Sequence, residues 1–375
     1  MPRISPSLIR QASHIDQRLV RLLPICRDLP SARNELRWLA EHAATKPGNE
    51  HGKRLLEYYI RRRARGEPLQ YILGTEYFGD LEMKCRPGVL IPRPETAASV
   101  SHLASLLLAR QLPPRLRVLD LCTGTGCIPL LLDHELRKRF RDSTTSAEIV
   151  AVDISPKALA LAKENLAAQP GAADFITFHP ADVLWDSDTN ENLNEPPSLK
   201  EALHARHGHG PMRNYDILIS NPPYISPKAF RTTTARSVRH YEPKLALVPP
   251  DQRTPRSYDG VTSDEDDAIG DLFYPAILRH AQDLDVKIML LEVGDLAQAL
   301  RVAGMIVRQG IWDHVEMWRD EPGYPVIESV LVDGVVITVR GRGSGRSVFA
   351  FRGEGRWWLD SDISNEWAST PVSKA

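Results

Sequence analysis

The group Asn221-Pro222-Pro223-Tyr224 has the residue types best suited to gripping a ligand. It follows directly on an apolar run over residues 215–220 that predicts a buried strand. Each proline fixes its own φ angle and restricts the residue before it, so the asparagine and the first proline are both held extended. The Asn221 amide and the Pro222 carbonyl then become rigid hydrogen-bond partners at the carboxyl end of a strand, where open α/β sheets bind ligands. We expect a clamp for a flat –NH2 group there; a simple strand-ending turn is the alternative.

A glycine-rich turn earlier in the chain has the form of a cofactor site. The apolar strand over residues 117–121 runs into Cys122-Thr123-Gly124-Thr125-Gly126, and an apolar helix is expected over residues 128–132. A strand, such a turn and a helix bring backbone N–H groups close to a ligand. Asp153 ends the next predicted strand, where its carboxylate can accept hydrogen bonds from two ribose hydroxyls. The pattern fits NAD, FAD or S-adenosylmethionine.

Two details of the turn argue against a dinucleotide. The third glycine of the G-x-G-x-x-G pattern is missing, because Ile128 and Pro129 occupy that region. Pro129 also has no N–H group, and pyrophosphate binding depends on such donors where the helix begins. S-adenosylmethionine has no phosphate, and Asp182, after a third predicted strand, could accept from its adenine amino group; a helix cap or turn is the alternative for Asp182. We therefore expect S-adenosylmethionine as the cofactor.

Strands that alternate with helices are expected to position these groups. Apolar runs predict strands at residues 117–121, 149–152, 175–178, 215–220 and 287–293, and two closing strands at 315–318 and 347–351. Ser155 and Pro156 are a typical cap and first residue for the helix after the second strand. This order predicts an α/β fold with a doubly wound, mostly parallel sheet.

The chain is expected to contain four parts. Residues 1–66 have a helical pattern, with Ser31 as the cap of one helix and Pro47-Gly48 as the break before the next. This small domain carries no catalytic group, so we expect it to recognise a substrate or partner. Residues 67–96 contain short β-type runs at 76–78, 81–83 and 89–91 and predict a hairpin connector. The core domain follows over residues 97–355, and residues 356–375 form a C-terminal tail.

Three polar stretches interrupt the core domain, near residues 186–212, 249–267 and 323–344. The first two are rich in residues that favour loops, and both are expected as surface loops. The third is expected to carry a hairpin around Asp333-Gly334. None of them gathers a set of titratable groups, so we interpret all three as insertions.

The composition argues against several kinds of site. The net charge of −1 draws the chain to no nucleic acid, although Arg61-Arg62-Arg63-Ala64-Arg65 forms a local basic cluster. The cysteines Cys26, Cys85, Cys122 and Cys127 form no C-x-x-C pair and have no histidine cluster beside them, so no metal site is expected. No apolar stretch is long enough to predict a transmembrane helix, so no membrane partner is expected.

Further stretches accompany the Asn-Pro-Pro-Tyr group. They are Gly66-Glu67-Pro68-Leu69-Gln70-Tyr71-Ile72-Leu73-Gly74, Leu90-Ile91-Pro92-Arg93-Pro94-Glu95-Thr96, Asp120-Leu121-Cys122-Thr123-Gly124-Thr125-Gly126 and Val238-Arg239-His240-Tyr241-Glu242-Pro243. This succession resembles the HemK/PrmC family of peptide chain release factor glutamine N5-methyltransferases, over residues 36–300. The first two of these stretches are absent from DNA adenine methyltransferases in general, so the resemblance is specific.

The resemblance implies a class I methyltransferase core, with a Rossmann-like sheet, behind the helical domain. It implies S-adenosylmethionine as the methyl donor and the glutamine of the Gly-Gly-Gln loop of a class I release factor as the substrate, in support of translation termination. By position, the methionine part of the cofactor would be held by the turn residues Cys122, Thr123, Gly124, Thr125 and Gly126. Asp153 would hold the ribose, and Asp182 with Val183 would contact the adenine. The glutamine amide would be held by Asn221, Pro222, Pro223 and Tyr224. Of these, Asn221, Pro222 and Tyr224 would be the catalytic residues, and Asn221 would also contact the cofactor.

Two positions depart from the family pattern. Cys122 stands where the family usually has glycine, and Ala97 stands where a second acid often follows the Arg-Pro-Glu-Thr stretch. Neither change removes a proposed side-chain ligand, although Cys122 narrows the space beside the turn.

Amide chemistry agrees with this implication. An amide nitrogen is a poor nucleophile because its lone pair is delocalised into the carbonyl. If Asn221 Oδ1 and the Pro222 carbonyl each accept one N–H, they fix the nitrogen against the methyl group, and such positioning supplies ~7–11 kcal/mol in favourable cases. These acceptors also stabilise the positive charge that develops on nitrogen. No strong general base is then needed before attack, and the proton can leave to water afterwards.

Two other functions are alternatives. A nucleic-acid amino-methyltransferase acting on adenine N6 or guanine N2 would need a flipped base and a basic channel, and a non-catalytic partner-binding module would not need an intact Asp153. We expect a monomer without stable nucleic-acid binding. The first 15 residues hold Arg3, Arg10 and no acid, which suggests an organellar presequence and, with the insertions, the mitochondrial matrix; a bacterial cytoplasmic protein is the alternative.

Overall fold

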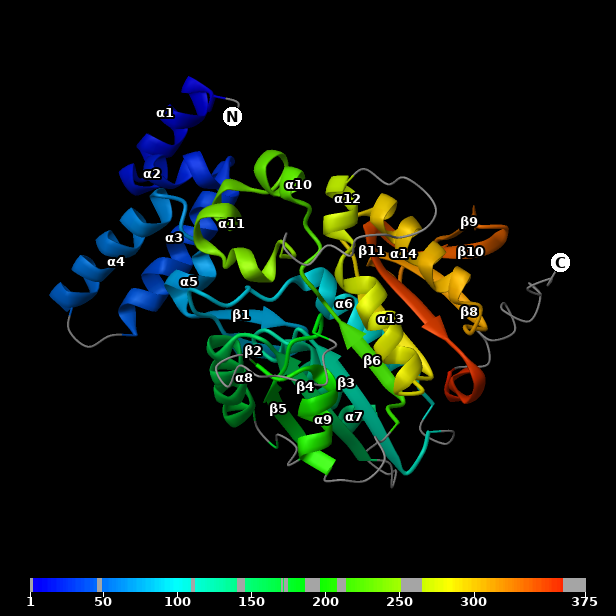
Figure 1. Ribbon diagram of the computed structural model, residues 1–375. Helices are drawn as coiled ribbons and strands as arrows, with labels where there is room; N and C mark the ends of the chain where they lie inside the picture. Colours follow the sequence, from blue (N-terminus) through cyan, green and yellow to red (C-terminus); the bar gives the residue numbers. More distant parts are fainter. Residues whose placement is uncertain are drawn as a thin grey trace.

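The computed structural model describes residues 3–45, 49–108, 112–139, 146–169, 171, 175–185, 196–207, 214–250 and 265–359. Figure 1 shows a group of N-terminal helices at one end, a twisted sheet with helices on both faces in the middle, and a β-hairpin at the opposite end. Every structural statement below concerns these residues.

The N-terminal helices form a unit with its own core. They are α1 (Pro6–Ile15), α2 (Gln17–Cys26), α3 (Leu29–Ala44), α4 (Asn49–Ala64) and the short α5 (Leu69–Leu73). Leu22, Leu39 and Ile60 are fully buried between them, and Leu8 of α1 packs against the same cluster. The stretch whose composition suggested a presequence therefore contributes to this core.

The cap of α3 differs from the prediction. Asp28, not Ser31, is the N-cap residue, and its Oδ1 accepts a hydrogen bond of 2.7 Å from the Ser31 N–H. Pro30 lies within the first turn of this helix, where a residue without an N–H group is tolerated. The helix therefore starts two residues before Ser31, and the predicted break at Pro47-Gly48 lies outside the described residues.

A short antiparallel hairpin follows the helical unit. Its strands are β1 (Thr75–Phe78) and β2 (Leu81–Lys84). The apolar run at residues 89–91, expected as a strand, forms a loop instead, and this loop leads into α6 (Pro94–Leu106). Its backbone is held by side chains rather than by a neighbouring strand, as described below for the site.

The central sheet has nine strands in the order β5-β4-β3-β6-β7-β11-β8-β10-β9. The strands are β3 (Arg115–Leu121), β4 (Ser146–Asp153), β5 (Ile176–Pro180), β6 (Ile217–Ser220), β7 (Ile288–Glu292), β8 (His314–Glu321), β9 (Ile327–Val332), β10 (Val335–Arg340) and β11 (Arg342–Phe351). The five strands from β5 to β7 are all parallel, whereas β11 is antiparallel to both of its neighbours. The prediction of a doubly wound, mostly parallel sheet is confirmed.

The order of the strands reverses direction between β3 and β6. From β3 the chain builds outward through β4 to β5, and it then returns to place β6 on the other side of β3. In such folds the crevice at the carboxyl ends of the two central strands is the place where ligands bind. The turn at Cys122 follows β3 and the Asn221 group follows β6, so the topology brings the two predicted sites to one crevice.

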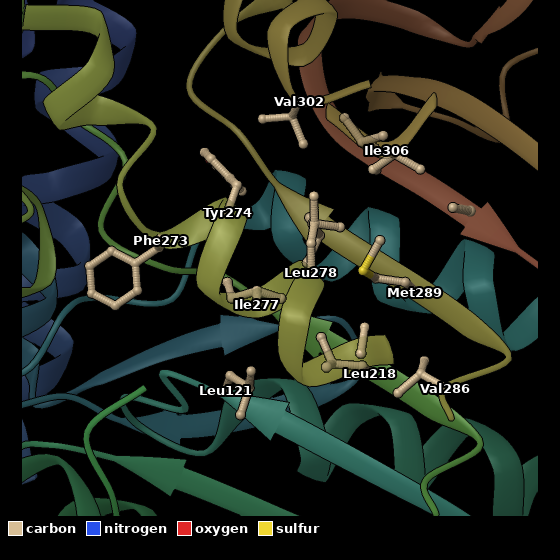
Figure 2. Packing of buried hydrophobic residues seen from close by; sticks show 14 of the residues in the cluster. Leu121, Leu218, Phe273, Tyr274, Ile277, Leu278, Val286, Met289, Val302 and Ile306 are labelled. Atoms are coloured by element: carbon tan, nitrogen blue, oxygen red, sulfur yellow. The ribbon is translucent and has the colours of Figure 1, made fainter. Parts of the chain in front are cut away.

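Each face of the sheet is covered by helices and closes its own apolar core. One face packs against α6, α7 (Cys127–Arg139) and α8 (Pro156–Ala168). The other packs against α9 (Leu199–His207), α13 (Phe273–Asp283) and α14 (Leu296–Gln309). Figure 2 shows the second core, where Leu218 and Met289 of the sheet meet Ile277 of α13.

Two of the polar stretches are not simply loops. Within residues 186–212, α9 packs Leu199 and Leu203 against the sheet, and Arg206 pairs with Glu148 of β4 at 2.8 Å. Near residues 249–267, the short α12 (Glu265–Gly270) begins before the predicted loop ends, and residues 251–264 lie outside the described chain. Sequence reasoning missed α9 because the helix is short and the stretch around its apolar residues is polar. The third stretch contains β9 and β10, which pair through the turn at Asp333-Gly334.

The start of the predicted tail is part of the fold. Residues Gly353–Trp358 form a 3-10 helix, Trp358 and Leu359 are buried, and the Leu108 N–H donates to the Trp358 carbonyl at 2.8 Å. A tail beginning at residue 356 is therefore wrong for residues 356–359, because these residues close the core beneath α6. In the described part of the chain, no helix has the length and apolarity needed to cross a bilayer.

Candidate functional site

The turn after β3 has an unusual backbone conformation. Cys122, Gly124 and Gly126 have φ angles of 63°, 56° and 77°. Left-handed angles at alternate residues turn successive N–H groups toward one side and form a concave anion- or dipole-binding surface. Gly126 also has no room for a side chain, because an added Cβ would lie 3.0 Å from Ala162 Cβ and 3.1 Å from Phe178 Cζ. This turn thus brings backbone, not side chains, to the crevice.

Asp153 lies at the end of β4 and joins this turn to the next helix. Its Oδ2 accepts from the Gly124 N–H and its Oδ1 from the Ser155 N–H, both at 2.8 Å. Burial raises the pKa of Asp153, while these two backbone donors oppose the rise. Asp182 lies after β5, is buried, and accepts from the Leu184 N–H at 2.9 Å. Both acids therefore have fixed orientations beside the turn.

These residues line a pocket of about 170 Å³. Among the residues that the sequence predicted, Cys122, Gly124, Asp153, Asp182, Val183, Asn221 and Pro223 line it. Thr123, Thr125 and Gly126 do not line it; the two threonines are buried behind the turn. Val89 and Leu90 of the loop before α6, and Leu245 and Pro250 after α11 (Arg236–Tyr241), close the pocket from the other side.

Asp120 is a candidate residue to which sequence reasoning gave no role. It lies in β3 directly below the turn and is fully buried, and neither carboxyl oxygen has a hydrogen-bond partner in the part of the chain described here. Burial raises the pKa of Asp120 to about 8. An unpaired acid is expensive to bury. The available signal in the sequence was an acid two residues before Cys122, the first residue of the glycine-rich turn.

The pocket carries a concentration of acids. Burial raises the pKa of the Cys122 thiol well above its usual value, and Asp153, Asp120 and Asp182 each raise it further. Three carboxyl groups are therefore close to one point of the turn. Such a site repels phosphates and favours a ligand that carries positive charge together with hydroxyl and amino donors. No group of three or more metal-ligating side chains occurs among the described residues.

The Asn221 group is fixed at the carboxyl end of β6. Pro222 and Pro223 are buried, whereas Asn221 and Tyr224 are partly exposed. The Tyr224 carbonyl accepts from Gln298 Nε2 at 3.2 Å, and the Ile225 N–H donates to the Leu247 carbonyl at 2.9 Å. No hydrogen bond to the side-chain amide of Asn221 occurs within the described chain, so this amide is available to a ligand.

A second and larger pocket, of about 430 Å³, opens on the other side of Asn221. Tyr224, Gly294, Gln298 and Arg346 form part of its wall, together with α10 (Pro227–Thr232) through Ala229. The two pockets share three lining residues, Leu90, Asn221 and Ala246. A group held at Asn221 therefore faces both pockets at once.

The loop at residues 88–93, which lines both pockets, is held by side chains from two distant parts of the chain. The Tyr71 hydroxyl donates to the Val89 carbonyl at 2.6 Å. The Ile91 N–H donates to Glu242 Oε2 at 3.2 Å, and Arg93 forms an ion pair of 2.7 Å with the same carboxylate. Tyr71 and Glu242 thus shape the site although neither residue lines a pocket.

The chain is similar in sequence to known glutamine methyltransferases. No family model matches the chain. It is 36% identical over 252 residues to the mitochondrial MRF1 N(5)-glutamine methyltransferase MTQ1 of Saccharomyces cerevisiae, covering 66% of this chain and 68% of that protein. It is 37% identical over 235 residues to the probable MRF1 mitochondrial N(5)-glutamine methyltransferase mtq1 of Schizosaccharomyces pombe, covering 60% of this chain and 68% of that protein.

A bacterial relative and a solved structure extend the comparison. The release factor glutamine methyltransferase of Geobacter sulfurreducens is 31% identical over 296 residues, covering 76% of this chain and 84% of that protein. Among solved structures, the N-terminal domain of human METTL16 in complex with SAH has a TM-score of 0.40 and 16% identity, covering 77% of this chain and 82% of that chain. That structural likeness is too distant to carry an argument.

Proposed function

The chain belongs to the family of release factor glutamine methyltransferases, and from this premise we propose that its two pockets hold a methyl donor and a glutamine side chain on either side of Asn221. The enzyme transfers a methyl group from S-adenosylmethionine to the side-chain nitrogen of a release factor glutamine. The cofactor supplies an electrophilic methyl group on a sulfonium. The chain's own residues bind, orient and shield the two partners.

The smaller pocket suits this cofactor. Asp153 and Asp182 line this pocket, and they complement a ligand with a positive charge, ribose hydroxyls and an adenine amino group. Asp120 is buried behind the turn and does not line the pocket. We assign the ribose to Asp153, whose carboxylate is oriented by two backbone donors, and the adenine to Asp182 and Val183. The turn from Cys122 to Gly126 carries the methionine part, with Thr123, Thr125 and Gly126 shaping the turn from behind.

Asp120 has a further role in this assignment. Its carboxyl is buried without a partner and is uncharged near neutral pH, because burial raises its pKa to about 8. A cationic ligand beside the turn favours the ionised form. Cofactor binding would then give this acid the electrostatic partner that it lacks in the free protein.

The acceptor amide is assigned to Asn221, Pro222, Pro223 and Tyr224. Asn221 Oδ1 and the Pro222 carbonyl accept the two N–H groups of the glutamine amide, which turns its nitrogen toward the smaller pocket. Pro223 keeps the segment extended, and the Tyr224 ring packs against the plane of the amide. Two acceptors also stabilise the positive charge that builds on nitrogen as the new bond forms. The proton is lost after transfer, so the site needs no strong base before attack.

One observation carries this proposal: Asn221 lines both pockets, as do Leu90 of the loop before α6 and Ala246 of the segment after α11. Methyl transfer requires the donor carbon and the acceptor nitrogen to approach within about 3–3.5 Å on a line. A single residue that contacts both ligands is the simplest way to meet that requirement. The larger pocket, which opens to the surface on this side, has room for a loop of another protein.

Incubation of the protein with S-adenosylmethionine and a class I release factor tests the assignment. Intact mass and peptide sequencing should show one added methyl group on the glutamine of the Gly-Gly-Gln loop. A release factor with Gln→Ala at that position is the matched control and should gain none. Methylation of a DNA or RNA oligonucleotide in place of the release factor would favour the nucleic-acid alternative.

We also propose that the protein is located in mitochondria and that its substrate is a mitochondrial release factor. Two yeast relatives are named as mitochondrial methyltransferases of MRF1. Protease protection of the tagged protein in isolated mitochondria checks the location. Comparison of methylation rates on mitochondrial and cytosolic release factors checks the substrate.

A further inference from the structure

Glu292 is a buried carboxylate at the carboxyl end of β7, beneath the acceptor side of the site. Its Oε1 accepts from the Tyr224 hydroxyl at 3.3 Å, and its Oε2 accepts from the Thr96 hydroxyl at 2.5 Å. It lines neither pocket. The residue therefore touches the Asn221 group only through Tyr224, and it links that group to the start of α6.

The two hydrogen bonds define which form of Glu292 the geometry fits. Each hydroxyl donates to a different oxygen, so both oxygens act as acceptors, as they do in a carboxylate. A protonated acid would donate through one oxygen, so the hydroxyl on that oxygen would have to accept instead, and the two donors would no longer converge on one charge. The Tyr224 hydroxyl is therefore held most strongly when Glu292 is ionised, because a hydrogen bond to a charged acceptor is stronger than one to a neutral acid.

The charged and titratable groups around Glu292 come from every element packed against it. Glu95 lies beside it on α6 and Arg346 on β11, while Tyr224 follows β6. Cys127 of α7 and the buried Tyr274 of α13 are also within its field, and the Tyr274 hydroxyl donates to the Glu292 main-chain carbonyl at 2.9 Å. Burial is the largest influence and raises the pKa of Glu292 to about 7, while Thr96 and Arg346 oppose the rise.

We propose that Glu292 is a positioning residue for methyl transfer, which in its ionised form holds the Tyr224 ring in the orientation that packs against the acceptor amide. This inference rests on the proposed function, because it assumes that Tyr224 contacts the substrate. The Tyr224 ring is also confined by Gly294, where an added Cβ would lie 3.2 Å from the ring. The hydrogen bond from the Tyr224 hydroxyl to Glu292 then restricts the motions that remain, which are rotation of the ring and its displacement toward the pocket.

A consequence is a dependence of turnover on pH. Glu292 is ionised above its pKa, so the productive arrangement is populated as pH rises through about 7 and is lost as pH falls below it. Displacement of a positioning group by about 1 Å can cost on the order of 10²-fold in rate. The enzyme should therefore show a kcat that rises toward alkaline pH with a midpoint close to 7.

Glu292→Gln tests this directly, since glutamine has the same shape but no ionisation. We expect kcat for release factor methylation to fall roughly 10- to 100-fold, with the cofactor Kd unchanged and the rise of kcat near pH 7 absent. Tyr224→Phe removes the hydroxyl and keeps the ring, so it should lower kcat to a similar degree. The double variant should lose no more than either single variant, because both changes break the same hydrogen bond.

Glu316→Gln is the matched control. Glu316 is a fully buried glutamate on β8, bonded to Trp318 and Arg340 and lining neither pocket. It should lower the melting temperature while leaving kcat and its pH profile as in the wild type. Melting temperatures of all variants separate loss of folding from loss of positioning.

The outcomes distinguish this inference from the proposed function. A wild-type protein that binds the cofactor and methylates no release factor overturns the proposed function. An active wild type together with a Glu292→Gln variant of equal kcat and equal pH profile overturns the positioning role alone. Additive losses in the double variant would also overturn it, since Glu292 and Tyr224 would then act separately.

Discussion

The Arg93 guanidinium donates to Glu242 Oε1 at 2.7 Å, between residues 149 positions apart in the chain. Glu242 is almost fully buried, and its other oxygen accepts from the Ile91 N–H at 3.2 Å. One carboxylate thus fixes both the backbone and a side chain of the loop that lines both pockets. This relationship explains why the stretches containing Arg93 and Glu242 accompany the Asn221 group, although Glu242 itself lines neither pocket.

Removal of Arg93 should destabilise the protein. Arg93→Leu leaves the Glu242 carboxylate buried without its ion-pair partner, and loss of one partner of a buried pair costs roughly 3 kcal/mol. Adding Glu242→Leu should recover part of the loss, because no unpaired charge is then left. Chemical denaturation of the wild type, of each single variant (Arg93→Leu and Glu242→Leu) and of the double variant measures this. Strictly additive effects would contradict the interpretation.

Asn221→Ala should separate binding from catalysis. The variant loses one acceptor for the glutamine amide, and loss of one such preorganised group lowers kcat by about 10²–10³-fold. The cofactor Kd should stay close to that of the wild type, because the turn and Asp153 are untouched. Calorimetry and single-turnover methylation give the two values. The control is Asn214→Ala, the same change at an exposed position outside both pockets. Normal turnover by Asn221→Ala would contradict the proposed mechanism.

The two glycines of the turn should respond differently to alanine. Gly126→Ala places a methyl group 3.0 Å from Ala162 Cβ at a φ of 77°, so it should mainly lower stability, with a left-handed penalty of about 1–2 kcal/mol plus the clash. Gly124→Ala has a φ of 56° and no atom within 4 Å of the added Cβ, and Gly124 lines the smaller pocket. It should mainly weaken cofactor binding. Thermal unfolding and cofactor titration of both variants check the contrast; an equal loss of stability in the two would contradict it.

Asp120→Asn should make the free protein more stable at neutral and alkaline pH. The pKa of Asp120 is raised from 3.8 to about 8 by burial, so between these values the unfolded chain is ionised and the folded chain is protonated. Wild-type stability is then lost as pH rises through this window, at up to about 1.4 kcal/mol per pH unit from this group. The asparagine variant lacks that loss. Its cofactor affinity should fall, since one of the three acids near the turn is gone.

Denaturation of wild type and Asp120→Asn between pH 5 and pH 8 tests the sign of this effect. The difference in unfolding free energy should grow toward pH 8 in favour of the variant. A difference that does not change with pH would show that Asp120 is ionised in the fold. Saturating cofactor should reduce the difference, because the ligand favours the ionised acid.

Two adjacent tryptophans test the corrected end of the fold. Trp358 is 5% exposed and packs in the core beneath α6, whereas Trp357 is 65% exposed. Trp358→Ala should cost ~3–5 kcal/mol, and Trp357→Ala should stay within about 0.5 kcal/mol of the wild type. Urea unfolding of both variants measures this. Equal stability of the two would show that residues 356–359 are a tail after all.

Several features followed from local sequence patterns. The short β runs, the glycine-rich turn and the acid after the second strand predicted the doubly wound sheet, because strand periodicity and backbone demands at glycine act over a few residues. The resemblance drawn from the Asn221 group and its companion stretches is confirmed by the relatives. The family and its chemistry could therefore be predicted from the sequence.

Other features depended on contacts between distant residues. The helix α9 forms because Leu199 and Leu203 find the sheet, although the stretch around them is polar. The N-cap of α3 is Asp28 and not the predicted Ser31, because the Asp28 carboxylate lies three residues earlier and accepts from the Ser31 N–H. The loop at residues 88–93 forms no strand because Tyr71 and Glu242 satisfy its backbone instead.

By itself the sequence determined the kinds of group at the site: a turn of backbone donors, an acid for the ribose and an amide clamp. Only the tertiary structure decided that Asp120 is buried without a partner, that Asn221 borders two pockets, and that Glu292 supports Tyr224. The physical reason is that burial, pKa and shared contacts depend on what surrounds a side chain. Those surroundings come from strands and helices far apart in the chain, and no spacing along the sequence records them.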